Sequence, residues 1–277
     1  MRLSISNIAW DSEEDAAVAR LLQKYAVDAI DIAPAKYFKN PRETKDTDIL
    51  RVKNWWADQG IEITGMQSLL FGTQGLNVFG DNAIKDEMLD HLQAICNIAN
   101  GLQATRLVFG SPKNRDRNGL DDDEVKKQAT EFFYRLGEIA EKNGVVICLE
   151  PNPPRYGANF MTNSADTAAI VRLVNHNAIG MQFDTGALQI NGEDPEAVLK
   201  QYSDIIKHIH ASEPDLVPLG DGGVDHRRVH DALIRYLPDH VVTIEMVATK
   251  NAPHLASIEH ALSNAIRSYR PHSGVGQ

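Results

Sequence analysis

Three carboxylates and one imidazole occupy the same position in four consecutive strand-like segments. Each stands at or just after the end of its segment, and the four residues are Glu150, Asp184, His210 and Glu245. The ends of neighbouring parallel strands meet at one edge of a sheet or at one mouth of a barrel. Carboxylates gathered around one point raise one another's pKa values unless a cation or a proton neutralises them. The pattern therefore predicts either a divalent metal site or a site with at least one protonated group.

The ligand types narrow the choice of metal. A set of three oxygens and one nitrogen without a thiolate suits Mn²⁺, Mg²⁺ or Co²⁺ better than a structural zinc site, although Zn²⁺ is also allowed. A single acid at a strand end is most often a cap or a solvated loop residue, and a single His on an apolar strand is most often a core residue. Recurrence in four units distinguishes this set, and we expect it to bind one divalent metal ion.

Strand-like segments alternate with helix-like segments along the whole chain. The eight predicted strands cover residues 3–9, 29–33, 61–67, 106–109, 145–149, 179–183, 206–210 and 241–244. The acidic run Asp121-Asp122-Asp123-Glu124 suits the start of a helix, where negative charge complements the macrodipole. Eight strand–helix units in 277 residues favour a closed parallel barrel over an open sheet. We predict an α/β protein with one (β/α)₈ TIM-barrel domain over residues 1–277 and a flexible tail at 271–277.

Composition and charge restrict the class of partner. The formal charge of −10 disfavours nucleic acid, which needs a basic face. No apolar run approaches the roughly 20 residues that span a bilayer, and the first residues enter a strand pattern without the apolar region of a signal peptide. Cys96 and Cys148 lie in apolar segments and are predicted to be reduced core residues. We expect a cytoplasmic protein that acts on a small molecule, with neither nucleic acid nor membrane as partner.

Four short motifs at the strand ends carry a resemblance to a known family. They are Leu149-Glu150-Pro151-Asn152, Phe183-Asp184-Thr185-Gly186, His208-Ile209-His210-Ala211-Ser212-Glu213 and Ile244-Glu245. They resemble the xylose isomerase-like TIM-barrel superfamily, and within it the sugar isomerase and epimerase group that includes the ketose 3-epimerases. The resemblance covers essentially the whole chain. It also implies that copies of the chain can associate as a homo-oligomer.

The resemblance implies a reaction and roles for the residues. Glu150, Asp184, His210 and Glu245 would hold the metal, and the substrate would be a ketose or a related polyol ketone. The metal would polarise the carbonyl. Glu150 and Glu245 would also act as acid and base on opposite faces of a metal-bound enediolate, which is the arrangement that inversion at carbon requires.

The chain departs from the ketose 3-epimerases at two positions that contact substrate in that group. Ala187 stands in place of a His, and Leu216 stands in place of an Arg. Other residues are therefore expected to line the mouth. The candidate substrate-binding residues are Trp10, Gln67, Asn152, Tyr156, His208 and Glu213. Of these, His208 points to the same side of its strand as His210 and is expected to lie deeper in the barrel.

Three other functions compete with epimerisation. Dehydratases of inosose-like or dehydroshikimate-like rings share the same metal-assisted proton abstraction. An apurinic endonuclease of this fold needs additional His ligands, but Phe109, Gly110 and Ala187 stand where they would be expected. A protein that binds metal without chemistry would not need both Glu150 and Glu245.

The loop after the fourth predicted strand is basic and contains Lys113, Arg115 and Arg117. This loop either is solvated surface or holds an anionic substrate group.

Overall fold

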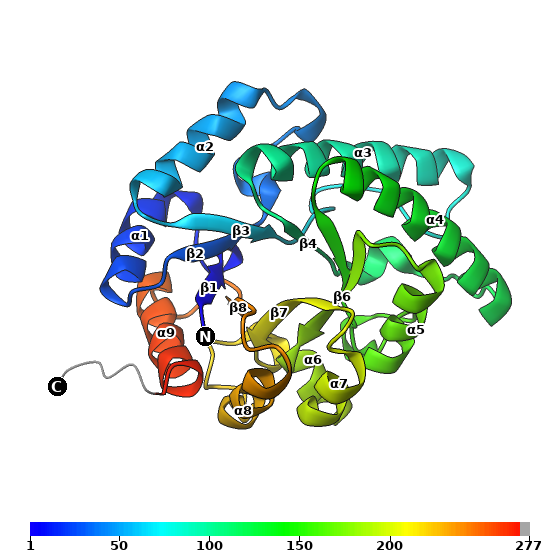
Figure 1. Cartoon of the computed structure of the whole chain (residues 1–277). Coiled ribbons are helices and arrows are strands. Elements are labelled where there is room, and N and C mark those ends of the chain that lie inside the picture. The colour runs from blue at the N-terminus through cyan, green and yellow to red at the C-terminus, as the bar shows by residue number, and fades with distance from the viewer. Residues whose placement is uncertain (272–277) are drawn as a thin grey trace.

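The computed structural model describes residues 1–271, and within them eight parallel strands close into a barrel in sequence order. Figure 1 shows the strands at the centre and the helices as an outer ring. The strands are β1 (Leu3–Ser6), β2 (Ala29–Ile32), β3 (Glu62–Met66), β4 (Arg106–Phe109), β5 (Val146–Leu149), β6 (Ile179–Asp184), β7 (Ile206–Ser212) and β8 (Val242–Glu245). The predicted (β/α)₈ barrel is confirmed.

The barrel closes through β1, which pairs with both β2 and β8. Ile5 lies opposite Ile30 on one side and Ile244 on the other, and all three side chains are fully buried. Parallel strands are covered on both faces, so they read in sequence as nearly continuous apolar runs. This explains why the strand pattern could be recognised from sequence.

Nine α-helices are present in the described part of the chain. They are α1 (Asp15–Lys24), α2 (Asp46–Asp58), α3 (Asn82–Leu102), α4 (Asp122–Lys142), α5 (Ser164–Val174), α6 (Thr185–Asn191), α7 (Pro195–Tyr202), α8 (His226–Tyr236) and α9 (His254–Tyr269). Asp121 caps α4 by accepting a hydrogen bond from the backbone of Glu124, as the acidic run predicts. The short helix α6, which begins directly after Asp184, is not predicted by the sequence pattern.

The ends of some elements differ from the prediction. The first strand stops at Ser6 instead of residue 9, because the chain turns into a 3₁₀ helix in which the Ser6 hydroxyl accepts a hydrogen bond from Ile8. The seventh strand continues to Ser212, two residues beyond His210. Of the tail predicted to be flexible, all residues except Pro271 lie outside the described part of the chain.

Two further predictions concern burial and membranes. Cys96 and Cys148 are buried free cysteines, as predicted. Between residues 1 and 271, no helix combines the length and the apolar character that crossing a bilayer requires.

Candidate metal centre and active site

The four predicted ligands meet at the C-terminal end of the barrel. Asp184 and His210 face each other across β6 and β7, while Glu245 ends β8 and Glu150 follows the last residue of β5. The side chain of His210 is fully buried, and those of the three carboxylates are 8–13% exposed. Four consecutive strands therefore deliver one ligand each to the same place.

One atom of each ligand points to a common centre. The His210 Nδ1 atom lies 3.3 Å from Glu245 Oε2, 3.5 Å from Glu150 Oε1 and 3.7 Å from Asp184 Oδ2. The four ligand atoms all lie within 4.8 Å of one another, and His210 Nδ1 has no hydrogen-bond partner although it is buried. These separations are long for hydrogen bonds but leave room for a cation bound by all four atoms. The oxygen-rich donor set thus fits a divalent metal.

Neighbouring amides hold the second oxygen of both glutamates. Asn152 Nδ2 donates to Glu150 Oε2 at 2.8 Å, and Gln67 Nε2 donates to Glu245 Oε1 at 2.6 Å. Each bond leaves the other oxygen of the carboxylate directed at the centre. Gln67 and Asn152, predicted as substrate contacts, therefore lie at the site and orient its two glutamates.

The third carboxylate is held by the start of α6. Asp184 caps this helix, because its Oδ1 accepts hydrogen bonds from the Ala187 backbone at 2.7 Å and from the Ser212 hydroxyl at 2.8 Å. Gly186 allows this packing, since a Cβ atom there would lie 2.8 Å from Ser212 Oγ. The unpredicted helix therefore fixes one of the predicted metal ligands.

The electrostatics of the protein alone favour a bound cation. Burial lowers the pKa of His210, but the charge of Glu245 and the other two carboxylates raise it well above its usual value. Burial raises the pKa of Glu245, and the charges of Glu150 and Asp184 add to this effect against the opposing influence of His210. Without a metal the cluster thus needs protons to offset its negative charge, and a divalent cation would replace them.

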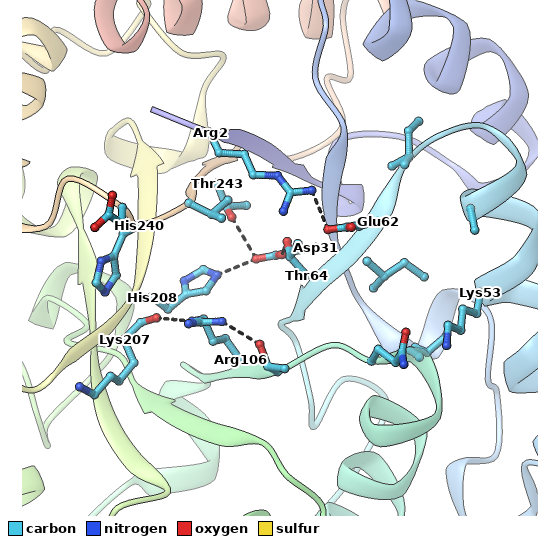
Figure 2. Close-up of a pocket in the computed structure, with 18 residues that line it drawn as sticks. Arg2, Asp31, Lys53, Glu62, Thr64, Arg106, Lys207, His208, His240 and Thr243 are labelled. Atoms are coloured by element: carbon cyan, nitrogen blue, oxygen red, sulfur yellow. Dashed lines mark hydrogen bonds and ion pairs between the residues drawn. The ribbon is translucent and has the colours of Figure 1, made fainter. Parts of the chain in front are cut away.

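A buried histidine–aspartate pair lies behind the four predicted metal ligands. His208 Nε2 donates to Asp31 Oδ2 at 2.6 Å, and the hydroxyls of Thr243 and Thr64 donate to the same carboxylate at 3.1 and 3.0 Å (Figure 2). The rings of His208 and His210 meet edge to face, with centroids 4.7 Å apart. His208 lies deeper in the barrel, as predicted, and supports the ligand ring instead of facing the mouth.

Asp31 is missed by the sequence analysis. Its signal is a carboxylate inside the apolar strand β2, where every residue is buried. Burial raises the pKa of Asp31, but the charge and hydrogen bond of His208 outweigh this and lower it below its usual value. Gly65 makes room for the carboxylate, because a Cβ atom there would lie 2.7 Å from Asp31 Oδ1.

Each end of the barrel opens into a cavity. The cavity at the C-terminal end has a volume of about 220 Å³ and includes Glu150 and Glu245 in its wall. The cavity at the N-terminal end, drawn in Figure 2, has a volume of about 740 Å³, with Asp31, His208 and Thr243 at its inner end. Active sites of (β/α)₈ barrels lie at the C-terminal end, so the smaller cavity is the candidate active site.

The position of the Glu150 carboxylate leaves no room for a side chain at residue 110. A Cβ atom at residue 110 would lie 1.8 Å from Glu150 Oε2. The glycine after β4 therefore provides the space in which the Glu150 carboxylate lies. In the sequence, Gly110 is notable only because it stands where an apurinic endonuclease would be expected to have a histidine ligand.

The remaining predicted substrate contacts have other partners. The Trp10 side chain is fully buried, and its Nε1 donates to Asp15 Oδ1 at 2.7 Å. The carboxylate of Glu213 is also buried and accepts bonds from the Gly220 and Val224 backbone and from His226. These bonds give Trp10 and Glu213 structural roles that the sequence did not predict.

Tyr156 lies on the loop after β5. Its hydroxyl accepts a hydrogen bond from the backbone of Asp215 at 2.8 Å, so it joins this loop to the loop after β7. A contact between Tyr156 and substrate stays a prediction.

Comparison with known proteins places the chain in a family. A family model described as xylose isomerase-like TIM barrel matches residues 19–269. The chain belongs to this family. Among curated proteins, a segment is 36% identical over 98 residues to inosose dehydratase of Lacticaseibacillus casei, covering 34% of this chain and 30% of the relative. Another is 25% identical over 123 residues to mannonate dehydratase of Rhizobium meliloti, covering 41% of this chain and 31% of the relative. The matches thus span about a third of each relative's length.

Several solved structures superpose over nearly the whole chain. A D-psicose 3-epimerase from Clostridium cellulolyticum has a TM-score of 0.75 at 17% identity, covering 98% of this chain and 96% of that one. The 3-keto-D-glucoside 4-epimerase of E. coli has a TM-score of 0.77 at 16% identity, with 93% and 97% covered. An IolI protein with a bound zinc atom has a TM-score of 0.76 at 20% identity, with 99% and 100% covered. At these identities the similarity shows the shared fold alone.

Proposed function

We propose that this protein is a metal-dependent isomerase or epimerase that acts on a ketose or a related polyol ketone. The observation that carries the proposal is the convergence of Glu150, Asp184, His210 and Glu245, each with one atom directed at a single centre. Both glutamates also line the cavity that would hold the substrate. The site therefore combines a cation position with two carboxylates able to accept or donate a proton.

A divalent cation at these ligands would supply electrostatic stabilisation of the negative charge that develops on the substrate oxygens. The chain's own residues would move the proton. One of Glu150 and Glu245 would take a proton from the carbon beside the carbonyl, and the other would return one to the opposite face.

The amide bonds would prepare the two glutamates for this task. Gln67 and Asn152 each hold one carboxylate oxygen, so the free oxygen keeps its direction when substrate binds. Asp184 also has one oxygen held, by Ala187 and Ser212, but unlike the two glutamates it does not line the cavity, which suits a group that holds the cation and transfers no proton.

A second candidate is a dehydratase that uses the same proton abstraction and then expels a hydroxyl group. It is favoured by the similarity of part of the chain to proteins named inosose dehydratase and mannonate dehydratase. The structural neighbours named as epimerases support the first candidate. The two reactions share the first step, in which a glutamate removes the proton.

The test is deuterium incorporation from D₂O, followed by NMR with Mn²⁺-loaded protein and a panel of ketoses, inososes and dehydroshikimate. We expect deuterium on the carbon next to the carbonyl. An epimer in the same tube selects the epimerase, and a new alkene signal selects the dehydratase. Absence of exchange with every compound would count against proton abstraction by Glu150 and Glu245.

We also propose that the chain acts as one domain in the cytoplasm.

A further inference from the structure

The wall of the candidate active site contains one cationic side chain, that of Lys113. The other lining side chains are the two glutamates, neutral polar groups and apolar groups, and the full set is Gln67, Ser68, Leu69, Leu70, Phe71, Val108, Phe109, Gly110, Ser111, Lys113, Glu150 and Glu245. Lys113 is the only Lys or Arg among them. Within residues 1–271, its ammonium group takes part in no hydrogen bond or ion pair that the structure shows. Building on the proposed function, we propose that the substrate carries an anionic group, a carboxylate or a phosphate, and that Lys113 binds it.

The loop holds Lys113 at this position through its neighbour. Asn114 is buried, and its side chain donates to the Leu76 carbonyl at 2.8 Å and accepts from the Ser111 hydroxyl at 2.6 Å. The backbone carbonyl of Asn114 accepts a hydrogen bond from the backbone N–H of Val78 at 2.9 Å. The backbone next to Lys113 is therefore anchored, and the exposed lysine side chain extends from a fixed point at the rim of the cavity.

A second cation lies behind the same wall. Arg115 is buried, and its Nη2 atom donates to the Gly110 carbonyl at 3.5 Å, while Nε and Nη1 have no hydrogen-bond partner. Burial lowers the pKa of Arg115 to about 10, and the charge of Glu150 opposes this effect. The guanidinium stays charged at neutral pH, so it adds a second positive charge on the β4 side of the site.

The negative charge of the protein and of the predicted ligands opposes the binding of an anionic substrate. Lys113 is the lysine of the cavity wall that can counter this repulsion. The protein has a formal charge of −10, and three carboxylates stand at the metal position. A divalent cation would offset two of these three negative charges, so one negative charge would remain at the ligands and would oppose an anionic group nearby. Lys113 is placed to offset this repulsion at the cavity wall, and a neutral sugar would have no need of it.

The experiment compares matched substrates that differ in charge. Deuterium exchange with Mn²⁺-loaded protein is measured for D-fructose, D-fructose 6-phosphate and D-fructuronate, and for the corresponding D-tagatose series. We expect kcat/KM for an anionic member to exceed that for its neutral partner by about tenfold or more, as a hydrogen bond to a charged group allows. The phosphate and carboxylate members distinguish the two sources of negative charge.

Three variants assign the preference to Lys113. We expect K113Q to reduce the anionic-to-neutral ratio of kcat/KM by about tenfold and K113R to preserve most of it. K126Q removes the same charge from an exposed position on α4, so it controls for the change in net charge and should leave the ratio unchanged. A preference for the neutral ketose, or an equal effect of K113Q on both members, would overturn the inference and leave the proposed function standing.

Binding measurements distinguish a failure of the proposed function from a failure of the inference about Lys113. If no compound exchanges deuterium, the proposed function fails for this panel, and calorimetric titration with the same sugars and with inorganic phosphate still tests Lys113. Tighter binding of the anions to the wild type than to K113Q would support the inference. Equal binding to the two proteins would overturn it.

Discussion

The two ends of the barrel hold ionisable groups in opposite ways. At the C-terminal end, Glu150 and Glu245 each direct one oxygen at a buried His210 nitrogen that has no partner. At the N-terminal end, Asp31 accepts three hydrogen bonds, and Arg2 forms ion pairs with two acids. The paired end nevertheless has the larger cavity, about 740 Å³ against about 220 Å³. The convergence of four ligand atoms on one centre, and not the size of a cavity, identifies the candidate active site.

The largest expected effect concerns the two glutamates. If E150Q and E245Q each remove a proton-transfer group, deuterium incorporation should fall by about 10³-fold, within the range typical of acid–base catalysis. Mn²⁺ binding measured by calorimetry shows whether the metal is retained, and E131Q is a control on the exposed face of α4. Turnover within a few-fold of the wild type in both variants would refute their assignment as acid and base.

At the opposite end we expect a loss of stability instead. D31N alters the carboxylate that accepts hydrogen bonds from His208, Thr243 and Thr64, and leaving such buried partners unsatisfied costs about 1–3 kcal/mol of unfolding free energy. Urea denaturation measures this cost. Mn²⁺ affinity should change little, because Asp31 is not one of the four converging predicted ligands. If D31N abolished metal binding at unchanged stability, the contrast between the two ends would be wrong.

Gly110 tests the geometry at the C-terminal end. In G110A the new methyl group must displace the carboxylate of Glu150, because the two would be only 1.8 Å apart. We expect Mn²⁺ affinity to fall by about 100-fold, as calorimetry would show, with the barrel still folded. In the E150A background the carboxylate is absent, so G110A should add almost nothing. Equal losses in both backgrounds would contradict the steric explanation.

The orienting amides should have smaller effects. Q67L and N152L each remove one hydrogen bond to a glutamate without removing a ligand. We expect each to weaken Mn²⁺ binding by about tenfold, as is usual for residues that hold metal ligands. Calorimetric titration would detect this change, and unchanged affinity in both variants would show that the carboxylates keep their directions without the amides.

The smallest effect is expected at the rim of the N-terminal cavity. R2M removes two ion pairs, with Asp28 at 3.0 Å and with Glu62 at 2.7 Å, but the arginine side chain is 36% exposed. Exposed pairs contribute at most about 1 kcal/mol, so the midpoint of urea denaturation should shift slightly. A loss as large as that of D31N would show that exposed and buried pairs contribute equally here.

Much of this arrangement could be predicted from sequence because it follows from strand periodicity. The apolar strands and the acids at their ends place Glu150, Asp184, His210 and Glu245 correctly at the barrel mouth. Positions that depend on packing could not be predicted in this way. Trp10 follows a strand but is buried against α2, where its ring centroid lies 6.4 Å from that of Trp56.

Residues that act through a neighbour were the hardest to predict. Asp31 looks like an isolated acid in an apolar strand until β7 brings His208 against it. Gly110 looks like a turn residue until the Glu150 carboxylate is placed. Glu213 belongs to a recognisable motif, but its hydrogen bonds reach Gly220, Val224 and His226 through the folded loop. In each case the partner is distant enough in sequence that local pattern carries no information about it.

The bond between Gln67 and Glu245 has a consequence for the order of folding. All four metal ligands come from β5 to β8, so an intermediate containing only the second half of the barrel could already bind a cation. Gln67 is 178 residues away from Glu245 and reaches it only after the first half has docked. During refolding, weak metal binding should therefore precede tight binding, and the interval between them would report the closure of the barrel.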